Sequence, residues 1–194
     1  MLDNVTIIIP VAPEEEAHKL LIDCLSQTNA EIIISSKNGR AKSMNDGANK
    51  ATKEFLWFLH ADTFVTTQNM HALDKALKIK PQAMHYFKLK FKSFGLVVLN
   101  AWGANIRSAL FNLPYGDQGL CLSKEDFNDM GGFDEKIALG EDLLLVRKAK
   151  KNNIAFNRVP STLITSARTY EKKGWLKTTM LYQRHLFKLL RIKL

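Results

Sequence analysis

Short apolar runs alternate with amphipathic segments along the first third of the chain. The runs Val5–Pro10, Ile32–Ile34 and Phe55–Leu59 are β-branched or aromatic and are bounded by polar residues, as in strands buried on both faces of a parallel sheet. Between them, residues 14–26 and 41–51 have the spacing of helices. This β-α-β-α-β alternation predicts an α/β domain with a mostly parallel central sheet.

The remaining two thirds of the chain continue this alternation. Alternating Phe87, Leu89 and Phe91 predict a half-exposed strand within residues 85–94. Further short strands are predicted at 120–122, 155–159 and 163–165, and further helices at 67–78, 96–111, 124–129 and 141–151. Residues 174–192 predict a basic amphipathic helix. Because no repeat or linker interrupts the pattern, residues 1–194 are predicted to form a single domain.

Charge and cysteine content narrow the function classes. The chain has 28 lysines and arginines against 19 acidic residues, a formal net charge of +9, which suits polyanionic partners. Its lysines are spread over many segments and form no interleaved aromatic motif of the kind that binds nucleic acid, so we do not expect nucleic acid as a partner. Cys24 and Cys121 match no metal or disulfide spacing. The N-terminus lacks the pattern of a signal peptide, and no apolar run reaches the roughly 18 residues of a membrane span. We therefore expect a cytoplasmic protein.

Two acidic positions stand where α/β domains bind ligands. Asp62 follows the Phe55–Leu59 strand, and ligands bind outside the carboxyl ends of such strands. Glu141 and Asp142 open a predicted helix after Gly140. One carboxylate near a cation can hold a diphosphate, and a second can act as a general base. The other interpretation is an ordinary loop at Asp62 and a helix-dipole contact at Glu141 and Asp142.

Six segments in order resemble family 2 glycosyltransferases of the GT-A fold, and in particular a bacterial subgroup associated with arsenosugar biosynthesis. The segments are VTIIIPVAPEE, GRAKSMNDGANKA, FLWFLHADT, YGDQGLCLSKEDFNDMGGFDE, GEDLLLVRKAKK and TSARTYEKKGW, which span almost the whole chain. The resemblance implies a single GT-A domain that transfers a sugar from a nucleotide-diphosphate donor to an acceptor hydroxyl with inversion.

The resemblance also implies roles for residues of the metal and catalytic motifs. His60, Ala61 and Asp62 match the DxD-type motif, in which the last aspartate binds Mg²⁺ or Mn²⁺. Since His60 stands where relatives have an aspartate, the metal would depend chiefly on Asp62. Glu141 and Asp142 match the ED motif, with the aspartate as catalytic base.

Further residues fall at donor and acceptor positions of the family. Arg168 matches a basic residue near the site, and Gly116, Asp117 and Gln118 match the acceptor and donor-sugar pocket. The nucleotide-binding positions are matched by Pro10, Glu14, Glu15, Arg40, Asn45 and Ala61.

One departure from the family opens an alternative function. Ile32–Ser36 runs almost directly into Gly39 and Arg40, so the domain is shortened after its second strand and lacks the family's base-contacting aspartate. The alternative is a catalytically degenerate nucleotide-binding or scaffolding relative.

The sequence does not identify the acceptor or the surface that the C-terminal helix contacts. The resemblance implies an acceptor that is either lipid-linked or a small sugar. The apolar side of helix 174–192 can lie in a membrane interface, at the inner face of the cell membrane, or it can pack on the domain or in a homodimer.

Overall fold

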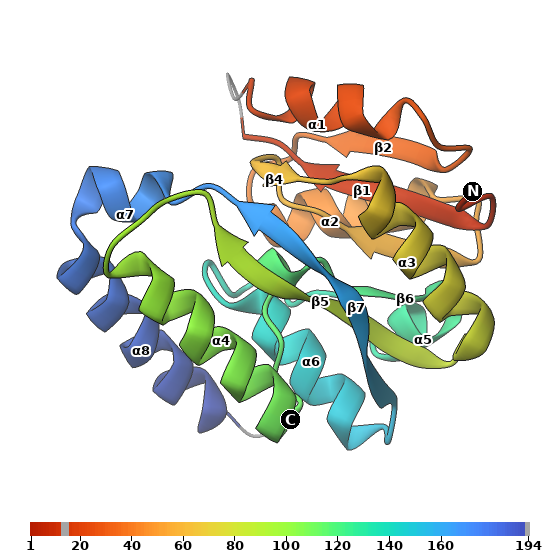
Figure 1. Cartoon of the computed structure of the whole chain (residues 1–194). Coiled ribbons are helices and arrows are strands. Elements are labelled where there is room, and N and C mark those ends of the chain that lie inside the picture. Colours follow the sequence, from red (N-terminus) through yellow and green to blue (C-terminus); the bar gives the residue numbers. More distant parts are fainter. Residues whose placement is uncertain (13–15, 193–194) are drawn as a thin grey trace.

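A computed structural model describes residues 1–12 and 16–192 and folds them around one seven-stranded sheet with helices on both faces (Figure 1). The strands are β1 (Val5–Pro10), β2 (Glu31–Ser35), β3 (Phe55–Phe58), β4 (Thr63–Phe64), β5 (Ala83–Phe91), β6 (Cys121–Ser123) and β7 (Ala155–Thr165). The helices are α1 (His18–Leu25), α2 (Arg40–Lys50), α3 (Thr67–Ile79), α4 (Val97–Phe111), α5 (Lys124–Asp129), α6 (Glu141–Lys151), α7 (Arg168–Lys173) and α8 (Trp175–Leu190).

The strand order is β2-β1-β3-β6-β5-β7-β4. β1 pairs in parallel with β2 and β3, and β5 pairs in parallel with β7, so most paired residues lie in parallel pairings. β6 lies antiparallel between β3 and β5, and β4 pairs antiparallel with β7 at one edge. The predicted α/β class is confirmed, and residues 36–39 alone connect β2 to α2, as the shortened sequence predicts.

The strands bury both of their faces because successive side chains point to opposite sides of the sheet. Ile7 and Trp57 pack on the side covered by α1 and α3. Ile8, Leu56 and Phe58 pack on the side covered by α2, α5 and α6. This two-sided burial explains why β1 and β3 read as continuous apolar runs.

The prediction of two strands at 155–159 and 163–165 is wrong, because β7 is continuous. Its register against β5 shifts between the pairs Tyr86–Arg158 and Lys88–Thr162. Pro160 falls inside this irregularity, where a residue without an N–H is tolerated. The first helix also differs, since it begins only at His18.

Helices α4 and α8 run side by side on one side of the sheet, with α4 next to β5 (Figure 1). The Asn100 side-chain amide donates to Thr179 Oγ1 at 3.0 Å, and Trp175 Nε1 donates to Asn100 Oδ1 at 2.5 Å. Near the other end of α8, Arg147 of α6 donates to the carbonyl oxygens of Leu189 and Ile192. These bonds fix α8 over the carboxyl ends of the central strands. Within the described part of the chain, none of the helices has the length and apolarity needed to cross a bilayer.

Candidate active site

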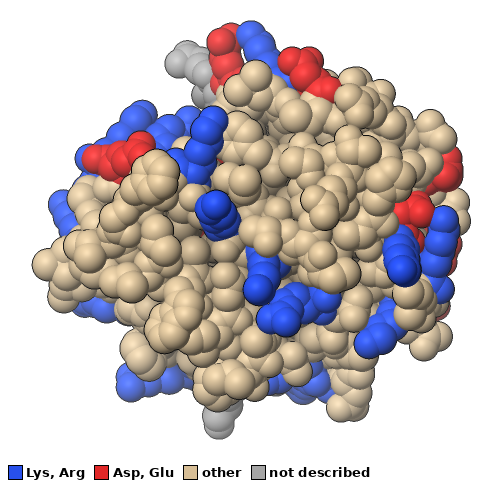
Figure 2. All heavy atoms as spheres, viewed as in Figure 1, with Lys and Arg blue, Asp and Glu red and all other residues tan. Residues whose placement is uncertain are grey.

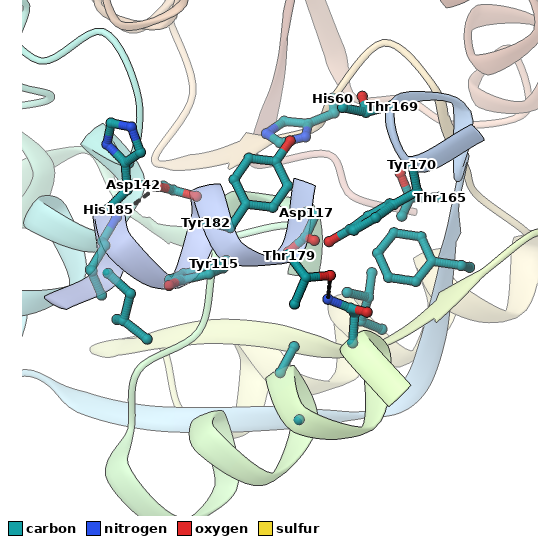
Figure 3. A pocket seen from close by; sticks show the side chains of 18 of the residues that line it. His60, Tyr115, Asp117, Asp142, Thr165, Thr169, Tyr170, Thr179, Tyr182 and His185 are labelled. Carbon is teal, nitrogen blue, oxygen red and sulfur yellow. Dashed lines mark hydrogen bonds between the residues drawn. The ribbon is translucent and has the colours of Figure 1, made fainter. Parts of the chain in front are cut away.

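A cavity of about 730 Å³ lies where β1 and β3 end, and α4, α7 and α8 cover it. Figure 3 shows His60, Asp117, Asp142, Tyr170 and Tyr182 around this space, with Tyr182 reaching into it from α8. One part of the wall is charged and comes from strand ends, loops and the N-termini of α2, α6 and α7. The other part comes mainly from apolar and aromatic residues of α4 and α8. The cavity therefore lies where the sequence predicts a site, but its far wall comes from the C-terminal half of the chain.

The structure brings most of the predicted site residues to this cavity. The predicted residues that line it are Pro10, Arg40, His60, Ala61, Asp62, Asp117, Asp142 and Arg168. The predicted residues that are described but do not line it are Asn45, Gly116, Gln118 and Glu141. Glu14 and Glu15 lie outside the described residues.

Asp142 is held in one orientation at the N-terminus of α6. Its Oδ2 accepts from the Gly116 N–H at 2.5 Å, and its Oδ1 accepts from the Leu143 N–H at 2.8 Å. A Cβ on Gly116 would lie 2.9 Å from His60 Nε2 and 3.0 Å from Asp142 Oδ2, so only glycine allows this approach. The side chain is 8% exposed, and the helix dipole favours its negative charge. Asp142 is thus an oriented anion in contact with the cavity.

Glu141 has a different position, because it does not line the cavity and instead binds Arg40. It is 1% exposed, and its Oε1 accepts from Arg40 Nε. Desolvation works against the charge of Arg40, but the hydrogen bond to Glu141 and the charges of Asp142 and Asp117 outweigh it and raise the Arg40 pKa. The guanidinium remains charged and lies with Nη1 3.5 Å from His60 Nε2. Glu141 therefore positions Arg40 rather than contacting a ligand in the cavity.

Burial changes the protonation of two further groups near Asp142. Desolvation, together with the charge of Arg40, holds the pKa of His60 well below its ordinary value, so the ring is neutral at pH 7. Desolvation and the charge of Asp142 raise the pKa of Asp117 to about 6. Asp117 Oδ1 is buried without a hydrogen-bond partner. Asp142 and Asp117 therefore differ in environment. Backbone amides donate hydrogen bonds to both carboxylate oxygens of Asp142, whereas Oδ1 of Asp117 is buried without a donor.

Asp62 and Arg168 lie at the more accessible side of the cavity. Asp62 Oδ2 is 4.0 Å from Arg168 Nη2, and the side chains are 26% and 46% exposed. Among the described residues, no group of three or more His, Cys, Asp or Glu side chains could hold a metal by itself. Mg²⁺ is often held by one or two carboxylates and completed by substrate phosphates and water. A cation of this kind would have Asp62 as its protein ligand, and His60 suits it less because its Nε2 faces the cationic Arg40.

Two predicted site residues make contacts inside the fold. Asn45 exchanges two hydrogen bonds, each 3.0 Å long, with the backbone of Phe133, joining α2 to the loop after α5. Gln118 is fully buried and donates to the carbonyl of Phe87 at 2.9 Å. It also accepts from Ser108 Oγ at 2.7 Å, which ties the turn to α4. Neither side chain lines the cavity, and each joins separate elements of the fold.

Sequence reasoning missed the aromatic and basic wall. The Arg107 guanidinium lies 3.6 Å from the ring centroid of Tyr115, and both line the cavity with Tyr170 and Tyr182. Burial raises the pKa of Tyr115 to about 12 and also raises those of Tyr170 and Tyr182. These phenols stay neutral and offer hydrogen bonds and flat apolar faces. Helical spacing alone does not show which residues of α4 and α8 turn toward a cavity.

Solved structures of other proteins share the fold of this chain. No family model matches the chain, and no curated protein matches it. Among solved structures, S. aureus TarS is similar with a TM-score of 0.63 and 16% identity, over 84% of this chain and 37% of TarS. A structure of TarS 1–349 in complex with UDP gives 0.63 and 15%, over 84% and 60%, and one with UDP-GlcNAc gives 0.59 and 14%, over 84% and 58%.

The chain thus spans about 60% of the TarS 1–349 fragment and less of the longer TarS chain. At this level of identity the likeness is one of fold. The chain has a shortened GT-A, Rossmann-like α/β fold of the kind seen in TarS, and the narrower arsenosugar subgroup remains a prediction.

Proposed function

We propose that the chain is an inverting, metal-dependent glycosyltransferase that uses a nucleotide-diphosphate sugar. The observation that carries the proposal is the meeting of Asp62, Asp142 and Arg40 at one cavity, although Asp62 and Asp142 are 80 residues apart in sequence. TarS, which shares the fold, has been crystallised with UDP and with UDP-GlcNAc. A cavity with carboxylates, cations and aromatic side chains suits a charged diphosphate and a sugar ring.

In the proposed reaction Asp142 accepts the proton of the acceptor hydroxyl. The acceptor oxygen forms a bond to the anomeric carbon while the bond from that carbon to the diphosphate oxygen breaks, so the electron pair leaves with the nucleoside diphosphate. The hydrogen bonds from Gly116 and Leu143 leave the carboxylate little freedom to turn, which favours a directed proton transfer.

Arg40 and Arg168 would stabilise the negative charge on the departing diphosphate. Glu141 holds Arg40 for this purpose, so its role is positioning. Asp62 would hold a divalent cation together with donor oxygens. When bound, that cation would act as a Lewis acid toward the leaving group.

Calorimetric titration with a panel of nucleotide sugars tests the donor half of this proposal. We expect at least one donor to bind in Mn²⁺ and to lose about tenfold or more in affinity in EDTA or in Asp62→Asn. Asp129→Asn is the matched control, because Asp129 is exposed and away from the cavity. Failure of every donor to bind, or equal effects of the two substitutions, would refute the proposed donor site.

A further inference from the structure

The outer surfaces of α4 and α8 carry large apolar side chains that the fold leaves uncovered. On α4 the apolar residues that pack inward are Val97, Ala101 and Ala104. The opposite side presents Leu99, Trp102 and Leu110, and Trp102 is 66% exposed. On α8 the exposed apolar residues Leu176, Met180 and Phe187 recur at helical spacing. We call these six residues the apolar face.

The two helices present this face as one surface. The Asn100–Thr179 hydrogen bond joins α4 to α8, and the helices run side by side (Figure 1). Figure 2 shows a broad uncharged area over these helices, with lysine and arginine side chains at its border. Single exposed apolar residues are ordinary, but a contiguous group of this kind marks an interaction surface.

Charge distinguishes among the partners that could cover the apolar face. α8 carries exposed Lys177, Arg184 and Lys188, and Arg191 follows it. From Lys172 to the end of the chain there is no acidic residue, and there is none between Lys92 and Phe111. A second copy of this surface would bring like charges together, whereas an anionic bilayer offers both an apolar interior and opposite charge.

The apolar face is also continuous with the cavity. Leu99 belongs to the face and lines the cavity, and Phe111 at the end of α4 is both exposed and part of the cavity wall. A partner that covered the apolar face would therefore lie next to the apolar wall of the cavity.

We propose that the apolar face and the basic residues of α8 form a docking surface for an anionic phospholipid bilayer. The bilayer accepts side chains such as Trp102 and Phe187 at its interface, and the lysines and arginines of α8 contact lipid phosphates. This proposal does not depend on the chemistry of the site.

Co-sedimentation with vesicles tests the proposal. The whole chain should bind vesicles of phosphatidylcholine with about 30% phosphatidylglycerol, and bind vesicles of phosphatidylcholine alone much more weakly. Replacing Lys177, Arg184 and Lys188 together by Gln should lower the partition coefficient about 100-fold. Replacing Leu176, Met180 and Phe187 together by Gln should lower it at least about tenfold.

Matched controls use residues of the same types elsewhere on the surface. Lys42, Lys75 and Lys136 are exposed away from α4 and α8, as are the apolar residues Leu20 and Ile79. Their replacement by Gln should change the partition coefficient less than about threefold, because they lie outside the contact.

Fluorescence provides a second readout, since of the three tryptophans Trp57 is fully buried, Trp175 is half-buried and Trp102 is exposed. A blue shift on adding anionic vesicles that disappears in Trp102→Phe supports docking through α4. Three outcomes would overturn the proposal: no sedimentation with anionic vesicles, equal loss in the control variants, or a dimer in solution that Phe187→Gln dissociates.

Discussion

Removing the charge of Glu141 should destabilise the protein and loosen Arg40. Two unit charges about 4 Å apart interact by about 4 kcal/mol at an effective dielectric constant of 20. The Arg40 side chain keeps 35% of its exposure and so recovers part of its hydration, while glutamine still accepts a hydrogen bond. We therefore expect Glu141→Gln to lower the free energy of unfolding by about 2 kcal/mol, which corresponds to a melting temperature lower by about 4–8 °C.

Urea denaturation followed by circular dichroism measures this loss. Exposed Glu125 provides the matched control, and Glu125→Gln should stay within about 0.5 kcal/mol of the wild type. Arg40→Gln should cost more, about 3–5 kcal/mol, because it leaves a buried carboxylate unpaired. The double variant should cost clearly less than the sum. Additive effects, or a Glu141→Gln variant as stable as the control, would refute the coupling of this pair.

Three further substitutions test the walls and electrostatics of the site. Gly119→Ala should lower the free energy of unfolding by about 2–4 kcal/mol in thermal melts, because φ is +63° and the new Cβ would lie 2.5 Å from Leu163 Cδ1. Gly103→Ala is the control and should not destabilise the protein, because its new Cβ would have no atom within 4 Å. Asp117→Asn should stabilise the protein at pH 8 by up to about 3 kcal/mol and have little effect near pH 4. Asp117 has a pKa of about 6 in the folded state, above the ordinary 3.8, so its ionisation lowers the free energy of unfolding progressively between about pH 4 and pH 6. A difference in stability that did not change with pH would contradict this reasoning. Gly116→Ala should lower transfer activity at least about tenfold, since the Cβ would displace His60 or Asp142, and an unchanged rate would argue against their positioning.

The parts of the fold that are predictable from the sequence are those set by local pattern. The runs at β1 and β3 are buried on both faces, and the Phe87, Leu89 and Phe91 alternation of β5 matches its burial. The continuity of β7 was not predictable, because Pro160 breaks the local signal and pairing with β5 overrides it.

The candidate site was predictable in its charged wall, which includes Arg40 and Arg168 as well as the aspartates, but not in the wall from α4 and α8. Asp62 and Asp142 belong to motifs at element ends, which can be recognised locally. The Arg40–Glu141 pair spans 101 residues, so only the folded chain shows that Glu141 supports Arg40. Likewise, the periodicity of α8 predicts an apolar side but not the turn of Tyr182 into the cavity.

The most direct test of the proposed reaction uses a nucleotide sugar that binds in the calorimetric panel. Release of nucleoside diphosphate and the donor dissociation constant are measured together for wild type and Asp142→Asn. The account predicts that Asp142→Asn binds the donor within about twofold of wild type, while release falls by about 10²–10⁴. Release at the wild-type rate from Asp142→Asn would contradict the assignment of Asp142 as the base.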